Sequence, residues 1–118
     1  MELHGVCIYT AAAPRLAAFY QAVLGEAPLC EGTHYSFARA KLAVYDPGHV
    51  RRVRQKTMSL MFAVFDVQAE FDRIVRDVAG VRVGSPPQRR PWGAFSCWLY
   101  DPDGNLFTLV EQGPPAGG

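Results

Sequence analysis

The feature of this sequence that most constrains its fold is that both halves show the same order of predicted elements. Residues 3–10 and 59–65 are apolar, β-branched and aromatic segments, each of which predicts a buried strand. Apolar residues at helical spacing follow each strand, at residues 14–24 and 67–78. Three short strands complete each half. Neither half is large enough to bury its sheet alone, so we expect a shared core, within one chain or across a dimer.

Capping and turn residues mark the ends of these elements. Pro14 suits a first helical turn and Gly25 suits a C-terminal cap. Asp66 is a good N-cap for the second helix, and Gly80 predicts its end. The other strand candidates are residues 35–40, 41–45, 81–83, 95–100 and 106–111; a loop with Pro86, Pro87 and Pro91 precedes the last two, and the turn Asp101–Asn105 joins them.

The predicted fold class is therefore α+β, with two βαβββ modules in one domain. Module one covers about residues 3–48 and module two about residues 58–112. Residues 49–57 are polar and basic, which we interpret as a solvated linker. The Pro- and Gly-rich residues 113–118 form a flexible tail in this prediction.

Composition excludes several classes of function. The chain has 118 residues, of which 49% are hydrophobic and 19% charged, as expected of one globular domain. A net charge of +1 gives no electrostatic case for binding nucleic acid or a membrane surface. The N-terminus lacks the pattern of a signal peptide, and the three cysteines are an odd number without C-x-x-C spacing. We therefore expect reduced cysteines and a cytoplasmic location.

Three segments resemble a known family. They are A-A-F-Y-Q-A-V-L-G at residues 17–25, M-F-A-V-F-D at 61–66 and P-W-G-A-F-S-C-W-L-Y-D-P-D-G-N at 91–105. Together they are similar to the vicinal oxygen chelate superfamily, which contains glyoxalase I, extradiol dioxygenases, fosfomycin-resistance enzymes and bleomycin-binding proteins. The resemblance implies two βαβββ modules that form an open, cup-shaped mixed sheet, often completed as a homodimer.

The resemblance also implies four metal-ligand positions. Metal-using members carry His or Gln, Glu, His and Glu there, and in this chain the positions fall on Gly5, Ala43, Ser59 and Thr108. None of these is a usual ligand of a catalytic divalent cation, so we expect no metal and no cofactor. His4 is one residue from the first position, but alternation along a strand points it away from the cup unless a bulge intervenes. His34 and His49 are expected at the surface or rim.

Alternation from these positions predicts which side chains line the cup. The helix-facing core has the opposite parity and is purely apolar: Val6, Ile8, Leu60, Phe62, Val64, Phe107 and Leu109. Trp92 resembles a family position that walls the ligand, whereas the face of Trp98, Tyr35 and Phe37 is not fixed by the pattern. The predicted ligand-binding residues are Cys7, Tyr9, Phe37, Tyr45, Ser59, Met61, Trp92, Trp98 and Thr108, and no catalytic residue is predicted.

The leading hypothesis is a metal-free protein that binds an aromatic or amphipathic small molecule, such as an antibiotic or secondary metabolite. Bleomycin-resistance-like members sequester antibiotics in this way. One alternative is a lyase, isomerase or dioxygenase of the same superfamily with an unrecognised metal site. Another is an interaction module that has lost its ligand. Arg89 and Arg90 either attract an anionic ligand group at the pocket rim or form a solvated loop pair, which we favour.

Overall fold

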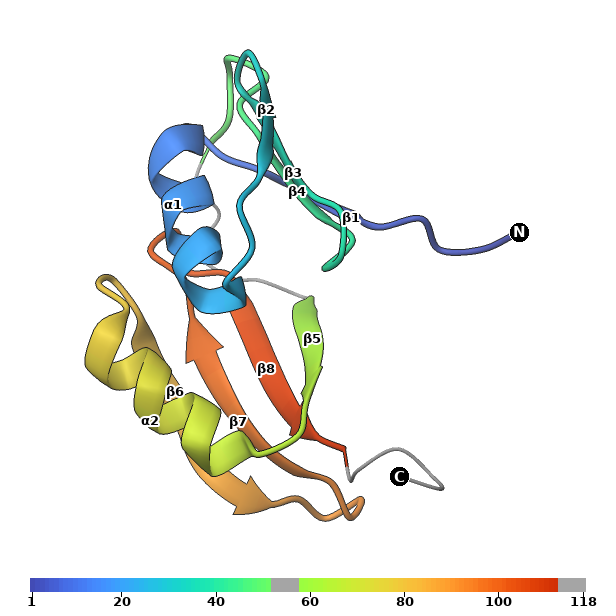
Figure 1. Cartoon of the computed structure of the whole chain (residues 1–118), viewed down its shortest axis with the longest axis vertical. Helices are drawn as coiled ribbons and strands as arrows, with labels where there is room; N and C mark the ends of the chain where they lie inside the picture. The colour runs from blue at the N-terminus through green and yellow to red at the C-terminus, as the bar shows by residue number, and fades with distance from the viewer. Residues whose placement is uncertain (52–57, 113–118) are drawn as a thin grey trace. The chain divides into compact units, whose positions relative to one another are not determined.

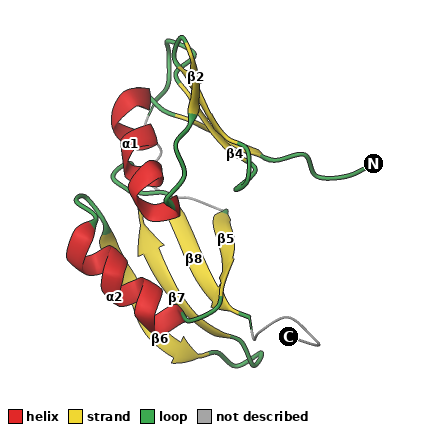
Figure 2. Ribbon diagram, in the orientation of Figure 1, coloured by secondary structure: helices red, strands yellow, loops and turns green. Residues whose placement is uncertain are grey.

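A computed structural model describes residues 1–51 and 58–112, and these residues form the two predicted βαβββ modules (Figures 1 and 2). The chain divides into two compact units, residues 1–53 and 54–118, a boundary that lies within the segment expected to be a linker. Residues 52–57 of that segment and the tail 113–118 lie outside the described residues. The elements in order are β1 (Val6–Tyr9), α1 (Ala13–Leu24), β2 (Leu29–Glu31), β3 (His34–Phe37), β4 (Leu42–Tyr45), β5 (Ser59–Val64), α2 (Val67–Asp77), β6 (Arg82–Arg89), β7 (Phe95–Tyr100) and β8 (Leu106–Glu111).

Each unit contains one four-stranded mixed sheet. The strand orders are β1-β4-β3-β2 and β5-β8-β7-β6, so the two sheets have the same topology. The first strand of each module pairs in parallel with the last one, and the long connection that a parallel pair requires consists of the helix and the two strands between them. The other pairs are antiparallel. The α+β fold of two βαβββ modules is thus confirmed.

The first helix begins and ends where the sequence predicts. Pro14 lies in its first turn, where a missing N–H is not needed. Gly25 adopts a left-handed conformation with φ of 67°, and its N–H donates to the carbonyl of Gln21. The apolar side of α1, including Leu16 and Tyr20, is fully buried, and the helix contacts β3 and β4.

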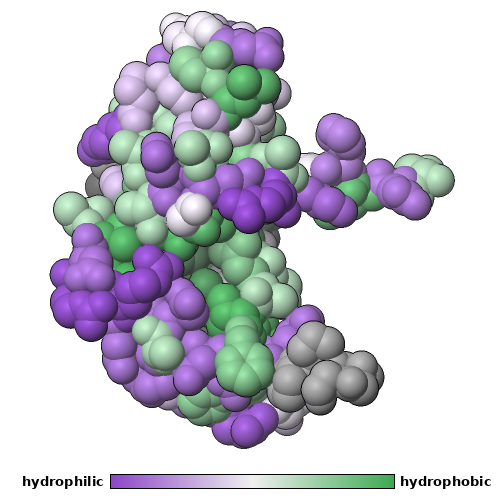
Figure 3. Space-filling view, viewed as in Figure 1, coloured by the Kyte–Doolittle hydropathy of each residue, from purple (hydrophilic) through white to green (hydrophobic). Residues whose placement is uncertain are grey.

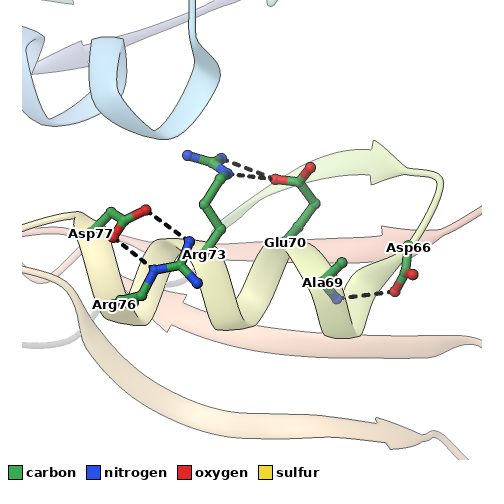
Figure 4. A network of polar contacts seen from close by, with 6 residues as sticks. All are labelled: Asp66, Ala69, Glu70, Arg73, Arg76 and Asp77. Carbon is green, nitrogen blue, oxygen red and sulfur yellow. Dashed lines mark hydrogen bonds and ion pairs between the residues drawn. The ribbon is translucent and has the colours of Figure 1, made fainter.

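The second helix begins at the predicted cap, where the Asp66 carboxylate accepts a 3.0 Å hydrogen bond from the amide of Ala69 (Figure 4). It ends earlier than predicted. Val78 is already extended, and Gly80, with φ of 88°, belongs to the turn that follows. Since Val78 is buried, its packing fixes the end of the helix rather than the glycine.

The outer side of α2 is polar, because charged side chains pair along it. Glu70 accepts from Arg73 at 2.9 Å, and Arg76 donates to Asp77 at 2.9 Å (Figure 4). Hydrophilic residues accordingly dominate the visible side of α2 in Figure 3. The described helices, of 12 and 11 residues, are too short to cross a membrane.

Two of the sheet positions predicted for the core, Phe107 and Leu109, are buried, whereas those on the edge strands β1 and β5 are half-buried: Val6, Ile8, Leu60, Phe62 and Val64. In the second unit, Phe107 and Leu109 on β8 are 0% and 2% exposed, next to the equally buried Cys97 and Leu99 on β7. In the first unit, Leu42 and Val44 on β4 form the corresponding layer. Alternation along the strands therefore separates a helix-facing side from a second side in both sheets.

Three strand predictions need correction. The first strand starts at Val6 rather than Leu3, and β2 at Leu29–Glu31 had not been located. The short strand predicted at residues 81–83 extends to Arg89 and includes Pro86 and Pro87. Proline is tolerated there because β6 is an edge strand whose register shifts twice, between Val83 and Ser85 and between Ser85 and Gln88.

The predicted hairpin between β7 and β8 is confirmed. Asp101 is 2% exposed, and its carboxylate accepts from the amides of Asp103 and Asn105 and from the side-chain amide of Asn105, at 2.8–2.9 Å. This turn sets the register in which Trp98 lies opposite Thr108.

We expect Asp101→Ala to lower the free energy of unfolding by about 2 kcal/mol, because amides inside the turn lose their acceptor. Urea denaturation would measure this loss. The control is Asp72→Ala on the exposed surface of α2, where Asp72 accepts only from Gln68 and where we expect a change within about 0.5 kcal/mol. Equal effects of the two substitutions would contradict this account of the turn.

We also expect two of the three cysteines to react in the folded protein. Cys7 and Cys30 are exposed, whereas Cys97 is fully buried, and burial raises the pKa of its thiol to about 11. Iodoacetamide labelling at pH 8 followed by peptide mass spectrometry should therefore modify Cys97 only after denaturation. Native labelling of Cys97 at the rate of Cys30 would mean that the β7 core is not packed as described.

Candidate functional site

Each sheet has one side that its helix does not cover, and we call these sides the first and second open faces. Their members share strand parity and cross-strand register. The first open face consists of Cys7, Tyr9, Leu29, Glu31, His34, Ser36, Ala43 and Tyr45. The second consists of Ser59, Met61, Ala63, Arg82, Ser85, Gln88, Ser96, Trp98, Tyr100, Leu106, Thr108 and Val110.

The first open face carries a cluster of aromatic rings. Tyr45 has a ring edge-to-face with Tyr9, with centroids 6.1 Å apart, and a second contact with the His34 ring at 5.6 Å. Tyr9 is 63% exposed. His34 had been expected only at the surface or rim, but its position opposite Tyr45 in the β3–β4 register makes it part of the cluster.

A cavity of about 690 Å³ lies beside the first open face. Cys7, Ala43, His34 and Ser36 border it, together with residues 2–5 that precede β1. The volume is in the range that holds a drug-sized molecule. Cys7 is exposed, and partial burial raises the pKa of its thiol, which keeps it protonated and disfavours a nucleophilic role.

Phe37, one of the predicted ligand-binding residues, lies on the helix-facing side of the first sheet. It borders the cavity, but its side chain is fully buried and it pairs with Leu42. Tyr35 pairs with Val44 and has the same parity. Both candidates therefore belong to the core side of the first sheet, and we assign Phe37 to packing.

The four positions that correspond to metal ligands do not suit a divalent cation. A side chain at Gly5 would place its Cβ 2.6 Å from the backbone oxygen of Lys41, so this position has no room for a ligand. Ala43 has no donor atom. The hydroxyls of Ser59 and Thr108 both donate to the carbonyl of Leu60, at 3.1 and 3.3 Å. Across residues 1–51 and 58–112, no three His, Cys, Asp or Glu side chains are grouped as a metal site would need.

The second open face combines apolar and hydroxyl groups in one row across three strands. Met61 on β5 lies opposite Thr108 on β8, which lies opposite Trp98 on β7. Met61 is 72% exposed, Trp98 is half-buried and Thr108 is buried. The structure therefore brings three of the predicted residues together, with Ser59 one row away beside Leu106.

Arg90 adds a charge to this face and corrects the interpretation of Arg89 and Arg90 as a solvated pair. Its side chain folds back over the Trp98 ring, 4.6 Å from the centroid, and the residue is only 8% exposed. Its guanidinium donates to the hydroxyl and carbonyl oxygens of Ser96 at 2.9 and 3.1 Å and to the hydroxyl of Ser85 at 3.0 Å. Arg89 is exposed as expected, and it donates to the carbonyl of Gly93.

Trp92 lies in the short loop between β6 and β7. The amide of Arg90 donates to Ala94 at 2.7 Å and that of Gly93 donates to Arg90 at 2.9 Å, which closes the loop. Trp92 is 69% exposed at this turn. Its side chain thus adds a large apolar surface two residues from the buried Arg90.

The sequence-based reasoning missed several members of these faces, among them His34, Ser96, Tyr100 and Arg90. Ser96 and Tyr100 could have been found, because they have the parity of Trp98 on a strand whose register the Asp101 turn determines. The position of Arg90 depends on the irregular register of β6, which no local sequence pattern predicts.

Known proteins show the same architecture. A protein of unknown function from Agrobacterium tumefaciens str. C58 is 24% identical, with a TM-score of 0.79 over 95% of this chain and 94% of that chain. A glyoxalase/bleomycin resistance protein/dioxygenase family enzyme from Burkholderia phytofirmans PsJN is 18% identical, with a TM-score of 0.79 over 94% and 98%. A lactoylglutathione lyase from Agrobacterium tumefaciens is 20% identical, with a TM-score of 0.69 over 93% and 92%. At these identities the likeness concerns the fold.

No curated protein matches the sequence. The family model of the Glyoxalase/Bleomycin resistance protein/Dioxygenase superfamily matches residues 2–109, which is nearly the whole chain. The segments that carried the resemblance lie within this range, as do all members of both open faces except Val110. The chain belongs to the glyoxalase/bleomycin resistance protein/dioxygenase superfamily.

Proposed function

We propose that this protein binds an aromatic or amphipathic small molecule on its open faces without the help of a metal ion. The observation that carries the proposal is the exposure of large apolar side chains on or beside the helix-free faces. Tyr9, Met61 and Trp92 are 63%, 72% and 69% exposed. Exposed apolar surface of this kind, interrupted by hydroxyl groups, is typical of ligand-binding surfaces.

We propose a metal-free site because of the donor atoms at the four ligand-equivalent positions. Gly5, Ala43, Ser59 and Thr108 supply no imidazole or carboxylate, and no side chain fits at Gly5 without movement of Lys41. Hydroxyl groups that donate to a backbone carbonyl are weak partners for a divalent cation. Binding by stacking and hydrogen bonding remains the chemistry that these residues can perform.

The biological role that we propose is sequestration of an antibiotic or a secondary metabolite by a cytoplasmic homodimer. The family description includes bleomycin resistance proteins. A second copy could cover apolar surface that a module of this size leaves exposed. The chemical identity of the ligand can be determined by titration with several planar compounds.

Binding can be measured by calorimetric titration with a panel of aromatic antibiotics, including a bleomycin. We expect saturable binding of at least one compound, with an affinity about two- to tenfold lower in Trp92→Ala, because a stacking wall is removed. Val75→Ala on α2, which is 44% exposed and lies on the other side of the sheet, should bind as the wild type does. Absence of binding by the whole panel, or equal weakening by both substitutions, would count against the proposal.

The metal content can be measured on protein that has been purified without any chelator. We expect elemental analysis to find no stoichiometric Zn, Ni, Mn or Fe, and added metal to leave the melting temperature unchanged. Stoichiometric metal would instead support the alternative of a lyase, isomerase or dioxygenase.

The close approach at Gly5 generates a further expectation. Gly5→Ala should lower the free energy of unfolding by about 1–3 kcal/mol, because its Cβ would meet the Lys41 backbone at 2.6 Å. Ala43→Ser, at the second ligand-equivalent position, serves as the control and should change stability by less than about 1 kcal/mol. A Gly5→Ala protein as stable as the wild type would show that the first position can accept a side chain after all.

A further inference from the structure

Within residues 58–112, Arg90 is the one charged side chain at the second open face that is buried. It is 8% exposed, whereas Arg82 on the same face is exposed and covers the Tyr100 ring at 5.0 Å. Removing a guanidinium from water is costly unless a carboxylate or several hydrogen bonds compensate for the lost hydration. The partners of Arg90 therefore indicate what its charge is for.

These partners are all neutral. Ser96 and Ser85 accept three hydrogen bonds from Arg90, and the Trp98 ring lies 4.6 Å from the guanidinium carbon. No Asp or Glu occupies a strand position of the second open face within residues 58–112, and no ion pair of Arg90 exists among the described residues. The residues outside the described ranges include no Asp or Glu either.

The acidic residues at the ends of β7 and β8 have partners of their own. Glu111 accepts from the amide of Val67 at the start of α2, at 3.0 Å. Asp101 accepts from three donors within its own turn. The charge of Arg90 is thus held in place by hydrogen bonds but is not neutralised by this part of the chain.

The hydrogen bonds also leave the guanidinium able to bind an anion. A guanidinium has five N–H donors in a planar fork. Three are used, by Ser96 twice and by Ser85 once, which leaves two, one on each terminal nitrogen. Serine and the indole ring orient the group before any ligand arrives, so little side-chain entropy remains to be lost on binding.

We propose that Arg90, oriented by Ser85 and Ser96, is an anion-binding subsite, and that the ligand of the second open face carries a carboxylate or another oxyanion beside its aromatic part. The aromatic part would stack at Trp98 and Trp92, which lie on the same hairpin as Arg90. This proposal rests in its aromatic half on the proposed function, whereas its anionic half depends on Arg90 alone.

Three probes test the anionic and the aromatic parts of this proposal separately: 2-naphthoate, its neutral analogue 2-naphthamide, and inorganic phosphate. Binding is followed by NMR at the Arg90 Nε–H and at the indole N–H groups of Trp92 and Trp98. We expect 2-naphthoate to bind about tenfold more tightly than 2-naphthamide, since hydrogen bonds to a charged acceptor are the stronger ones. Phosphate alone should shift the Arg90 and Trp98 signals in a saturable way that weakens with added salt.

Matched variants identify the residue responsible. Arg90→Gln should abolish the preference for 2-naphthoate over 2-naphthamide, and Arg90→Lys, which keeps the charge but loses the planar fork, should retain part of that preference. Arg89→Gln is the control, because it removes the same charge from the adjacent exposed residue and should preserve the preference. The indole signals and the melting temperature of each variant report whether the hairpin is still folded.

Each outcome has a distinct meaning. If 2-naphthamide binds as tightly as 2-naphthoate and phosphate shifts nothing, the anion subsite is overturned while the proposed function stands. Phosphate binding at Arg90 without any aromatic binding supports the subsite and contradicts the proposed function. Equal loss of preference in Arg89→Gln and Arg90→Gln would reduce the effect to general surface charge, and no response to any probe would overturn both proposals.

Discussion

Each module has one helix and a sheet with two sides, and most of the other properties of this protein depend on that imbalance. The helix covers the side formed by residues such as Leu99 and Phe107, which are fully buried and apolar. The other side has the alternate residues of the same strands, so any shift in register that changes this side also changes the core. Large exposed side chains such as Met61 occur there, and a ligand or a second copy would remove them from water.

The parts of the fold that sequence could predict are those set by local rules. Alternation and the Asp101 turn together determine that Met61, Thr108 and Trp98 share one row, because a hairpin fixes its own register. The missed β2, Leu29–Glu31, is three residues long and exposed throughout, so it has no hydrophobic pattern to detect. The length of β6 was missed because its prolines are compatible only with an irregular edge strand, and the sheet position of a strand is not a local property.

The residues of the candidate site likewise divide into those that local sequence patterns predict and those that they do not. Cys7, Tyr9, Tyr45 and Met61 follow from strand parity, and they lie on the predicted open faces. The position of Phe37 does not follow from strand parity. The length of the short turn before its strand decides which side chains face the helix, and the sequence does not predict that length. His34 and Arg90 were both placed too far from the site for a related reason. Charged and polar residues are usually exposed, and only a tertiary contact can reveal an exception.

The irregular strand β6 explains how a buried arginine arises in this position. Its two register shifts bring Ser85 opposite Trp98 and Gln88 opposite Ser96, so that Ser85, Ser96 and Trp98 surround the side chain of Arg90. A regular hairpin has no such register shifts. An exposed arginine is hydrated by water and does not require hydrogen bonds to serine. The arrangement holds a positive charge in a buried position at some cost to folding, which neutral side chains offset only in part. An anion that binds the folded state would supply the missing compensation, and its binding would stabilise the hairpin that carries Trp92 by the same free energy.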